Sequence, residues 1–208
     1  MSSVKSSDLR LSDILLIFRT KLFLMFAFVF GTSLVLVIFP NFSPILMASS
    51  RNVLTAFTSV FVHKDIVHLA ASATLTLAAL LLYSISNTIS GKKSENFIIL
   101  AIWLSAAAAT LAFVNTAPNA RLGGSSSLVS AFLCGVAVTA YINAWTEPAP
   151  RIKVAQIVIG TVLVAAFVAL NLNVDSGWMV TLHLTAFLYM AVIVLAKRFL
   201  SSFFSSKN

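Results

Sequence analysis

The chain has 208 residues, of which 59% are hydrophobic and only 10% are charged. A soluble domain carries about 25% charged residues, so this chain has too few charges to coat a water-facing surface and is predicted to be an integral membrane protein. Its net charge of +8 would also suit a nucleic-acid-binding protein, unless the positions of the charges explain it. The single cysteine, Cys134, excludes an intramolecular disulfide.

Residues 1–21 form an N-terminal segment that we expect at the cytoplasmic side or in the membrane interface. Leu11, Ile14, Leu15 and Phe18 follow the spacing of an amphipathic helix and lie among basic residues. This pattern predicts either a short helix on the membrane surface or an amphipathic lead-in to the first span. The apolar run that follows has the length of a span and no small-residue cleavage site, so a cleavable signal peptide is not expected.

A transmembrane helix needs roughly 20 apolar residues, and six apolar runs in the chain are of this length. Proline, glycine, asparagine or charged residues separate them. The sequence therefore predicts an all-α membrane protein in which residues 22–195 form one six-transmembrane-helix bundle, followed by a tail at 196–208. The predicted spans are 22–39, 66–85, 97–114, 126–144, 154–172 and 177–195.

Lysines and arginines set the orientation, because cytoplasmic loops retain positive charge. With six spans both termini lie on one side, and that side would hold eleven of the 14 basic residues, against Arg51, Lys64 and Arg121 on the other. Both termini are therefore predicted to be cytoplasmic, in a multi-pass protein of the cell membrane. Topology alone explains the basic balance, so no nucleic-acid partner is expected.

Polar residues within the apolar runs gather near the predicted outer side. His68 begins the second span, where Ser72 and Thr76 repeat its helical face, and His183 lies in the first turns of the sixth span. Ser126 begins the fourth span directly after Gly123 and Gly124. Ionisable groups inside spans are costly and are therefore functional candidates. We expect Ser126, His68 and His183 to meet at a shallow depth below the outer surface.

Simpler interpretations exist for each feature taken alone. A histidine within a span, or the face of His68, Ser72 and Thr76, can serve as a hydrogen bond between helices. The run GGSSS at 123–127 is typical of a turn and a helix N-cap. Ser127, Ala131 and Gly135 form a small-residue stripe that predicts close helix packing, Cys134 reads as a small core residue, and Asp175 as a solvated loop or helix-start charge.

Taken together, these residues predict nucleophilic catalysis. A serine hydroxyl becomes nucleophilic when an imidazole accepts its proton and later returns it to the leaving amine. A serine at a helix start also lies near unpaired backbone N–H groups that stabilise an oxyanion. Asp175 lies eight residues before His183, too far along a helix to complete a triad. The sequence predicts a Ser-His dyad.

The same residues resemble the rhomboid intramembrane serine proteases. The stretch TSVFVH at 58–63, followed by His68 and Leu69, is similar to the family's first-loop and second-span signature. Gly123 to Ser126, with Ala131 five residues later, is similar to its G-x-S-G nucleophile motif, and residues 175–186 around His183 are similar to its catalytic-histidine helix. The resemblance covers roughly residues 51–195, on the second, fourth and sixth spans.

This resemblance implies a six-helix bundle of the prokaryotic type around a watery cavity, which cleaves transmembrane segments of membrane proteins. It implies that Ser126 is the nucleophile and His183 the general base, with no metal or cofactor. His68, Ser72 and Ser125 would contribute to the oxyanion or substrate-binding site, and His63 would lie at its mouth. The implied partners are transmembrane-helix substrates and the lipid bilayer.

The chain departs from the family pattern at several positions. Ser72 replaces a usual asparagine, Ser127 replaces the glycine after the nucleophile, and Ala186 replaces a glycine after the histidine. The family's Trp-Arg pair in the first loop is not evident. A catalytically inactive rhomboid-like protein that binds membrane clients is therefore the alternative function. A transporter with a histidine proton relay is disfavoured, because the spans hold no carboxylates and no paired broken helices.

The three serines present a choice of register, because Ser125 and Ser126 both satisfy G-x-S. The two preceding glycines and the offset to Ala131 favour Ser126. Adjacent helical residues point about 100° apart, so only one of them can face His183. We expect Ser126 to point at His183, Ser127 to face a neighbouring helix, and Ser125 to contribute mainly its backbone to the turn.

Overall fold

The computed structural model describes residues 20–48, 54–63, 65–90, 95–116, 123–172 and 177–205. Within these residues all elements of regular secondary structure are helices. Six of these helices are long and apolar enough to cross a membrane. The all-α prediction is thereby confirmed for these residues, and the six long helices indicate a multi-pass membrane protein. The predicted interfacial helix at residues 11–18 lies outside the described residues, as do Arg51, Lys64, Arg121 and Asp175.

The six long helices agree with the predicted spans, except that α2 is shifted by one residue and the other five have added residues at one or both ends. They are α2 (Lys21–Ile38), α5 (Ile66–Ser90), α6 (Glu95–Thr116), α7 (Ser126–Thr146), α8 (Pro150–Leu172) and α9 (Gly177–Ser205). In the described parts of the connection between α2 and α5 there are four short helical segments, namely η2 (Pro40–Phe42), α3 (Ser43–Leu46), α4 (Thr55–Thr58) and η3 (Ser59–Phe61).

The last helix differs most from the prediction, because α9 continues past residue 195 to Ser205. Lys197 and Arg198 mark the end of the apolar run, but both are good helix formers. Neither glycine nor proline follows them before Ser205. Charge therefore ends the span without ending the helix.

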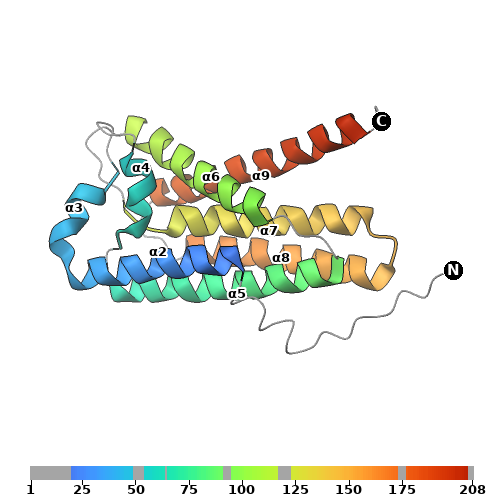
Figure 1. Ribbon diagram of the computed structural model, residues 1–208, viewed down its shortest axis with the longest axis horizontal. Coiled ribbons are helices and arrows are strands. Elements are labelled where there is room, and N and C mark those ends of the chain that lie inside the picture. The colour runs from blue at the N-terminus through green and yellow to red at the C-terminus, as the bar shows by residue number, and fades with distance from the viewer. Residues whose placement is uncertain are drawn as a thin grey trace.

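Helix α7 forms the centre of the bundle, with α2, α5 and α8 on one side and α6 and α9 on the other (Figure 1). In its most apolar window 78% of the residues are buried, against 28% to 50% in the other five helices. Consecutive long helices run in opposite directions (Figure 1). The first residues of α5, α7 and α9 therefore lie at one end of the bundle, together with α3 and α4.

Small residues let α7 approach its neighbours closely. A Cβ atom on Gly135 would collide with the side chain of Met190 in α9, and a Cβ on Gly160 of α8 would lie 2.9 Å from the ring of Tyr141. Ala131 and Cys134 are fully buried. The predicted close packing at Gly135 and the core position of Cys134 are both confirmed.

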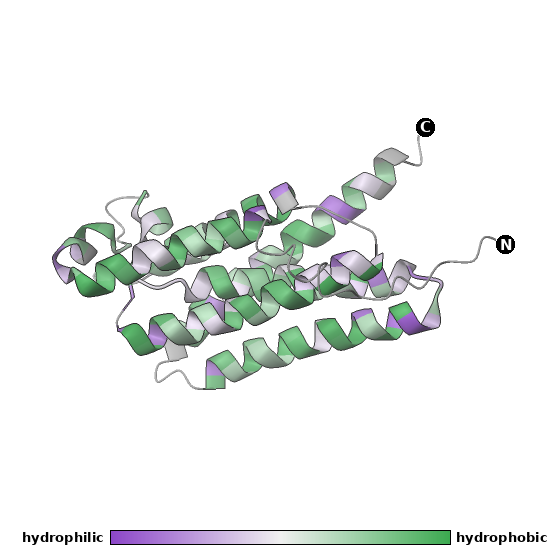
Figure 2. Cartoon of the chain, turned by 60° about the horizontal axis from the view of Figure 1, so that its bottom comes forward, coloured by the Kyte–Doolittle hydropathy of each residue, from purple (hydrophilic) through white to green (hydrophobic). Residues whose placement is uncertain are grey.

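The outer helices carry apolar side chains on the surface of the bundle. Phe28, Val67 and Val192 are 65%, 74% and 63% exposed. Hydrophobic residues run along the helices, whereas hydrophilic ones concentrate near the helix ends (Figure 2). An exposed apolar surface of this extent suits contact with lipid.

A polar pair joins two of the helices inside the bundle. The Ser86 hydroxyl of α5 donates to Oε1 of Gln156 in α8 at 2.7 Å, and Nε2 of Gln156 donates back to the Ser86 carbonyl at 2.9 Å. Both residues are buried. The two bonds satisfy an amide that would otherwise be costly inside a membrane.

Candidate functional site

The two glycines before α7 form a turn that packs tightly against the segment after η3. A Cβ atom on Gly123 would lie 2.8 Å from Cβ of Val62, so only glycine fits there. Gly124 has φ +136°, a conformation that disfavours side chains. Its N–H donates to the Ser59 carbonyl at 2.9 Å. The Gly-Gly pair thereby fixes where the three serines begin.

Ser125 holds the N-cap position of α7 but does not cap it. Its side chain makes no hydrogen bond to the helix backbone, because its Oγ lies 2.9 Å from Nε2 of His63 instead. The first N–H groups of a helix have no intrahelical acceptor, so those of α7 receive no side-chain cap from Ser125. This differs from the prediction that Ser125 contributes mainly its backbone.

His63 is a buried residue between η3 and α5. Its ring lies 6.4 Å from the ring of Phe30 and 5.7 Å from that of His68, centroid to centroid. Burial, together with repulsion from His68, lowers the pKa of His63 to about 4, against the weaker opposing effects of the Phe61 carbonyl and Asp65. The imidazole is therefore neutral at pH 7 and forms a neutral pair with Ser125.

His68 lies beside the glycine turn on the first turn of α5. The carboxylate of Asp65 accepts the backbone N–H of His68 at 2.8 Å and so caps this helix. A Cβ atom on Gly124 would lie 4.0 Å from Nε2 of His68 and 3.6 Å from Oγ of Ser126. The His68 ring and the Ser126 hydroxyl therefore both border Gly124.

His183 is held by an asparagine of the neighbouring helix. Nδ2 of Asn171 donates to the Phe167 carbonyl at 2.8 Å. This bond orients the amide, and Oδ1 of Asn171 lies 3.0 Å from Nδ1 of His183. Since an amide oxygen only accepts, Nδ1 must carry the proton. The other nitrogen, Nε2, is thereby an acceptor, and it is buried without a hydrogen-bond partner in the described part of the chain.

The structure brings these side chains to one end of the bundle. Ser126 starts α7 and His183 lies in the second turn of α9, at the end where both helices begin (Figure 1). His183 also lies within electrostatic range of His68. Ser126 is 2% exposed, and no hydrogen bond joins it to His183 among the described residues, since His183 Nε2 has no partner.

The hydroxyls on α5 contribute less than the sequence suggested. Thr76 donates to the carbonyl of Ser72 within its own helix at 2.8 Å, so its hydroxyl is not a bond between helices. Ser72 is buried one turn beyond His68. Its place on the His68 face is as predicted, and a direct bond to Ser126 is not among the described contacts.

Asn171 is a site residue that the sequence pattern did not predict. The sequence pattern singles out ionisable groups and hydroxyls inside the spans, although an amide at membrane depth is also costly unless it is hydrogen-bonded. The position of Asn171 near the end of an apolar run was the available signal. Its pairing with His183 depends on how α8 and α9 pack, and no local pattern encodes that.

Comparisons of this chain with models of protein families, with curated proteins and with solved structures gave no match. The arrangement combines an oriented imidazole with a free acceptor nitrogen, a buried serine at a helix start, uncapped backbone donors and a second histidine. Groups of these types can carry out acyl transfer when they are suitably placed.

Proposed function

We propose that this protein is a rhomboid-like intramembrane serine endopeptidase with Ser126 as nucleophile and His183 as general base. The observation that carries the proposal is the state of His183. Asn171 fixes the tautomer of His183, and the unprotonated Nε2 of His183 is buried without a partner among the described residues, at the end of the bundle where α7 begins. A third group that orients the base is the usual design of such sites.

In the proposed reaction the Ser126 hydroxyl adds to the scissile carbonyl while its proton moves to Nε2 of His183. The uncapped N–H groups at the start of α7, with His68 as an additional donor, stabilise the oxyanion. His183 then gives the proton to the leaving amine, and an acyl-enzyme remains on Ser126. Water, activated by the same imidazole, hydrolyses the acyl-enzyme and restores both residues.

The Ser126–His183 hydrogen bond would form when substrate binds. Catalytic hydrogen bonds are often long in unliganded enzymes and tighten in the complex. The substrate class follows from the location, since a site between the ends of membrane helices is reached most easily by another membrane segment. We propose transmembrane segments of membrane proteins as substrates, in a prokaryotic cell membrane.

An inactive rhomboid-like protein that binds membrane clients is the second candidate. It is favoured by the serines at positions 72 and 127 and by the missing bond to His183. The two candidates differ in one experiment, in which the purified protein is reconstituted in liposomes with single-span substrates. The proposal expects a cleaved product that disappears in both Ser126→Ala and His183→Ala. Binding of substrates without any cleavage by the wild type would overturn it.

The proposed orientation places both termini in the cytoplasm. It can be tested with cysteines at opposite ends of the bundle, because the native Cys134 is buried. A cysteine at exposed Asn115 should react with an impermeant maleimide added to intact cells, whereas one at Glu147 should be protected. The reverse pattern would place the site on the cytoplasmic face and contradict the proposal.

A further inference from the structure

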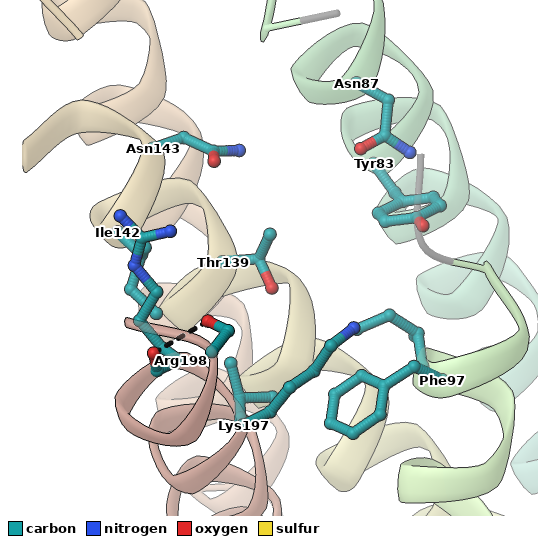
Figure 3. A pocket seen from close by; sticks show the side chains of 11 residues that line it. Tyr83, Asn87, Phe97, Thr139, Ile142, Asn143, Lys197 and Arg198 are labelled. Atoms are coloured by element: carbon teal, nitrogen blue, oxygen red, sulfur yellow. Dashed lines mark hydrogen bonds between the residues drawn. The ribbon is translucent and has the colours of Figure 1, made fainter. Parts of the chain in front are cut away.

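A cavity lies at the opposite end of the bundle from the serines. Its volume is about 180 Å³, and side chains of α5, α6, α7 and α9 line it (Figure 3). A cavity of about 150 Å³ holds a molecule of the size of benzene, so this one has room for a phosphate and part of a glycerol. It shares no lining residue with the Ser126 site.

The cavity combines positive charge with polar donors. Lys197 and Arg198 of α9 line it, and none of the described lining residues is acidic. Nζ of Lys197 lies 3.9 Å above the centroid of the Phe97 ring. The backbone carbonyl of Arg198 accepts a hydrogen bond from the Ser201 hydroxyl at 2.8 Å. Additional polar lining comes from Tyr83, Asn87, Thr139 and Asn143, which Figure 3 labels.

The position of the cavity specifies the kind of anion. Lys197 and Arg198 lie near the end of the apolar window Met179–Ser201, the depth at which lipid phosphates lie in a bilayer. On the same stretch of α9, Phe199 and Leu200 are 70% and 53% exposed. A ligand that has both an anionic group and an apolar chain could place the anionic group in the cavity and the chain along this surface.

We propose that this cavity binds the head group of an anionic phospholipid, with Arg198 and Lys197 holding the phosphate and an acyl chain lying along α9. Basic pockets between transmembrane helices recognise lipids in this way. A zwitterionic choline lipid suits the site less well, because its ammonium group would approach two cations. The inference is independent of the proposed protease activity, since it concerns other residues at the other end of the bundle.

Thermal unfolding in detergent micelles tests the proposal. The probes are phosphatidylglycerol, phosphatidylcholine with the same acyl chains, and soluble glycerol phosphate. A ligand that binds only the folded state raises the melting temperature. We expect phosphatidylglycerol to raise it in a saturable way, and the other two probes to have little effect. An equal effect of glycerol phosphate would overturn the lipid assignment.

Variants separate the cavity from general charge attraction. Arg198→Gln and Lys197→Gln should each weaken phosphatidylglycerol binding by about tenfold, since a charge-assisted hydrogen bond is lost. Arg151→Gln and Lys153→Gln are matched controls, because both residues are exposed on α8 at the same end and outside the cavity. The melting temperature of each variant in phosphatidylcholine shows whether that variant is folded. Equal weakening in the α8 controls would overturn the cavity as the binding site.

Discussion

Nε2 of His63 and Oγ of Ser125 lie 2.9 Å apart, and both side chains are buried. This bond ties the segment before α5 to the start of α7 and draws the Ser125 side chain away from the helix backbone that it would otherwise cap. It is a structural bond in the proposed scheme, because the Ser125 hydroxyl is paired with His63, which lies outside the proposed Ser126–His183 dyad. The structural role of Ser125 and the catalytic role proposed for Ser126 can be tested separately.

Ser125→Ala should lower the thermal stability of the protein. The substitution leaves a buried imidazole nitrogen unpaired, at a cost of about 1–3 kcal/mol in the free energy of unfolding. Ser130→Ala is the matched control, because the buried Ser130 hydroxyl has no hydrogen-bond partner among the described residues and its removal sacrifices no bond. Melting temperatures in micelles should fall for the first variant and stay or rise for the second. Equal behaviour would contradict the role of the His63–Ser125 bond.

Acid should weaken the same bond through His63. The pKa of His63 in the folded protein is about 4, below the ordinary histidine value of 6.5, so the unfolded chain takes up a proton at a higher pH than the folded one. The stabilisation is complete above pH 6.5 and is lost as the pH falls toward 4. The melting temperature of the wild type should therefore decline more steeply over this window than that of His63→Gln. Parallel curves would show that His63 is not buried as a neutral imidazole.

Gly124→Ala should damage both stability and the site. A residue with a side chain is strained at φ +136°, at a cost of about 1–3 kcal/mol, and the added methyl group borders the Ser126 hydroxyl and His68. Gly31→Ala is the control, since nothing lies within 4 Å of its added Cβ and alanine stabilises a helix interior by roughly 0.5–1 kcal/mol. The two variants should shift the melting temperature in opposite directions. A stabilising Gly124→Ala would refute the turn geometry.

The sequence predicted the six helices because their apolar runs have the length of a membrane crossing. It also predicted the placement of Ser126, His68 and His183 at one end, since alternation of the spans puts three helix starts together. The sequence did not predict which residues form hydrogen bonds with these side chains. The bonds of Ser125 with His63, and of His183 with Asn171, join residues that are far apart in the chain. The packing of whole helices decides such bonds.

The end of α9 illustrates a different limit. Lys197 and Arg198 stop the apolar run, so the hydropathy pattern places the span end there, yet helix propensity continues to Ser205. Hydropathy reports where the membrane ends, and propensity and capping report where the helix ends. The two boundaries coincide only where a helix breaker follows the last apolar residue.

Asn171→Leu should slow the reaction while the fold survives. Without the amide oxygen, His183 can adopt the tautomer whose Nε2 carries the proton, and that tautomer cannot accept one from serine. We expect about a tenfold or larger loss in the rate of modification by a fluorophosphonate, which reports general-base assistance. Gln156→Leu, on the same helix, should lower the melting temperature by removing its bonds to Ser86 but leave the rate unchanged. An unchanged rate in Asn171→Leu would remove it as a positioning residue.

The central claim is that Ser126 is the nucleophile that His183 activates. Mass spectrometry of the fluorophosphonate-treated protein tests it most directly, because the adduct can be assigned to one of the adjacent serines. The account predicts a single adduct on Ser126 in the wild type, its loss in Ser126→Ala and His183→Ala, and its persistence in Ser125→Ala. An adduct on Ser125 that depends on His63, or equal modification of wild type and His183→Ala, would contradict it.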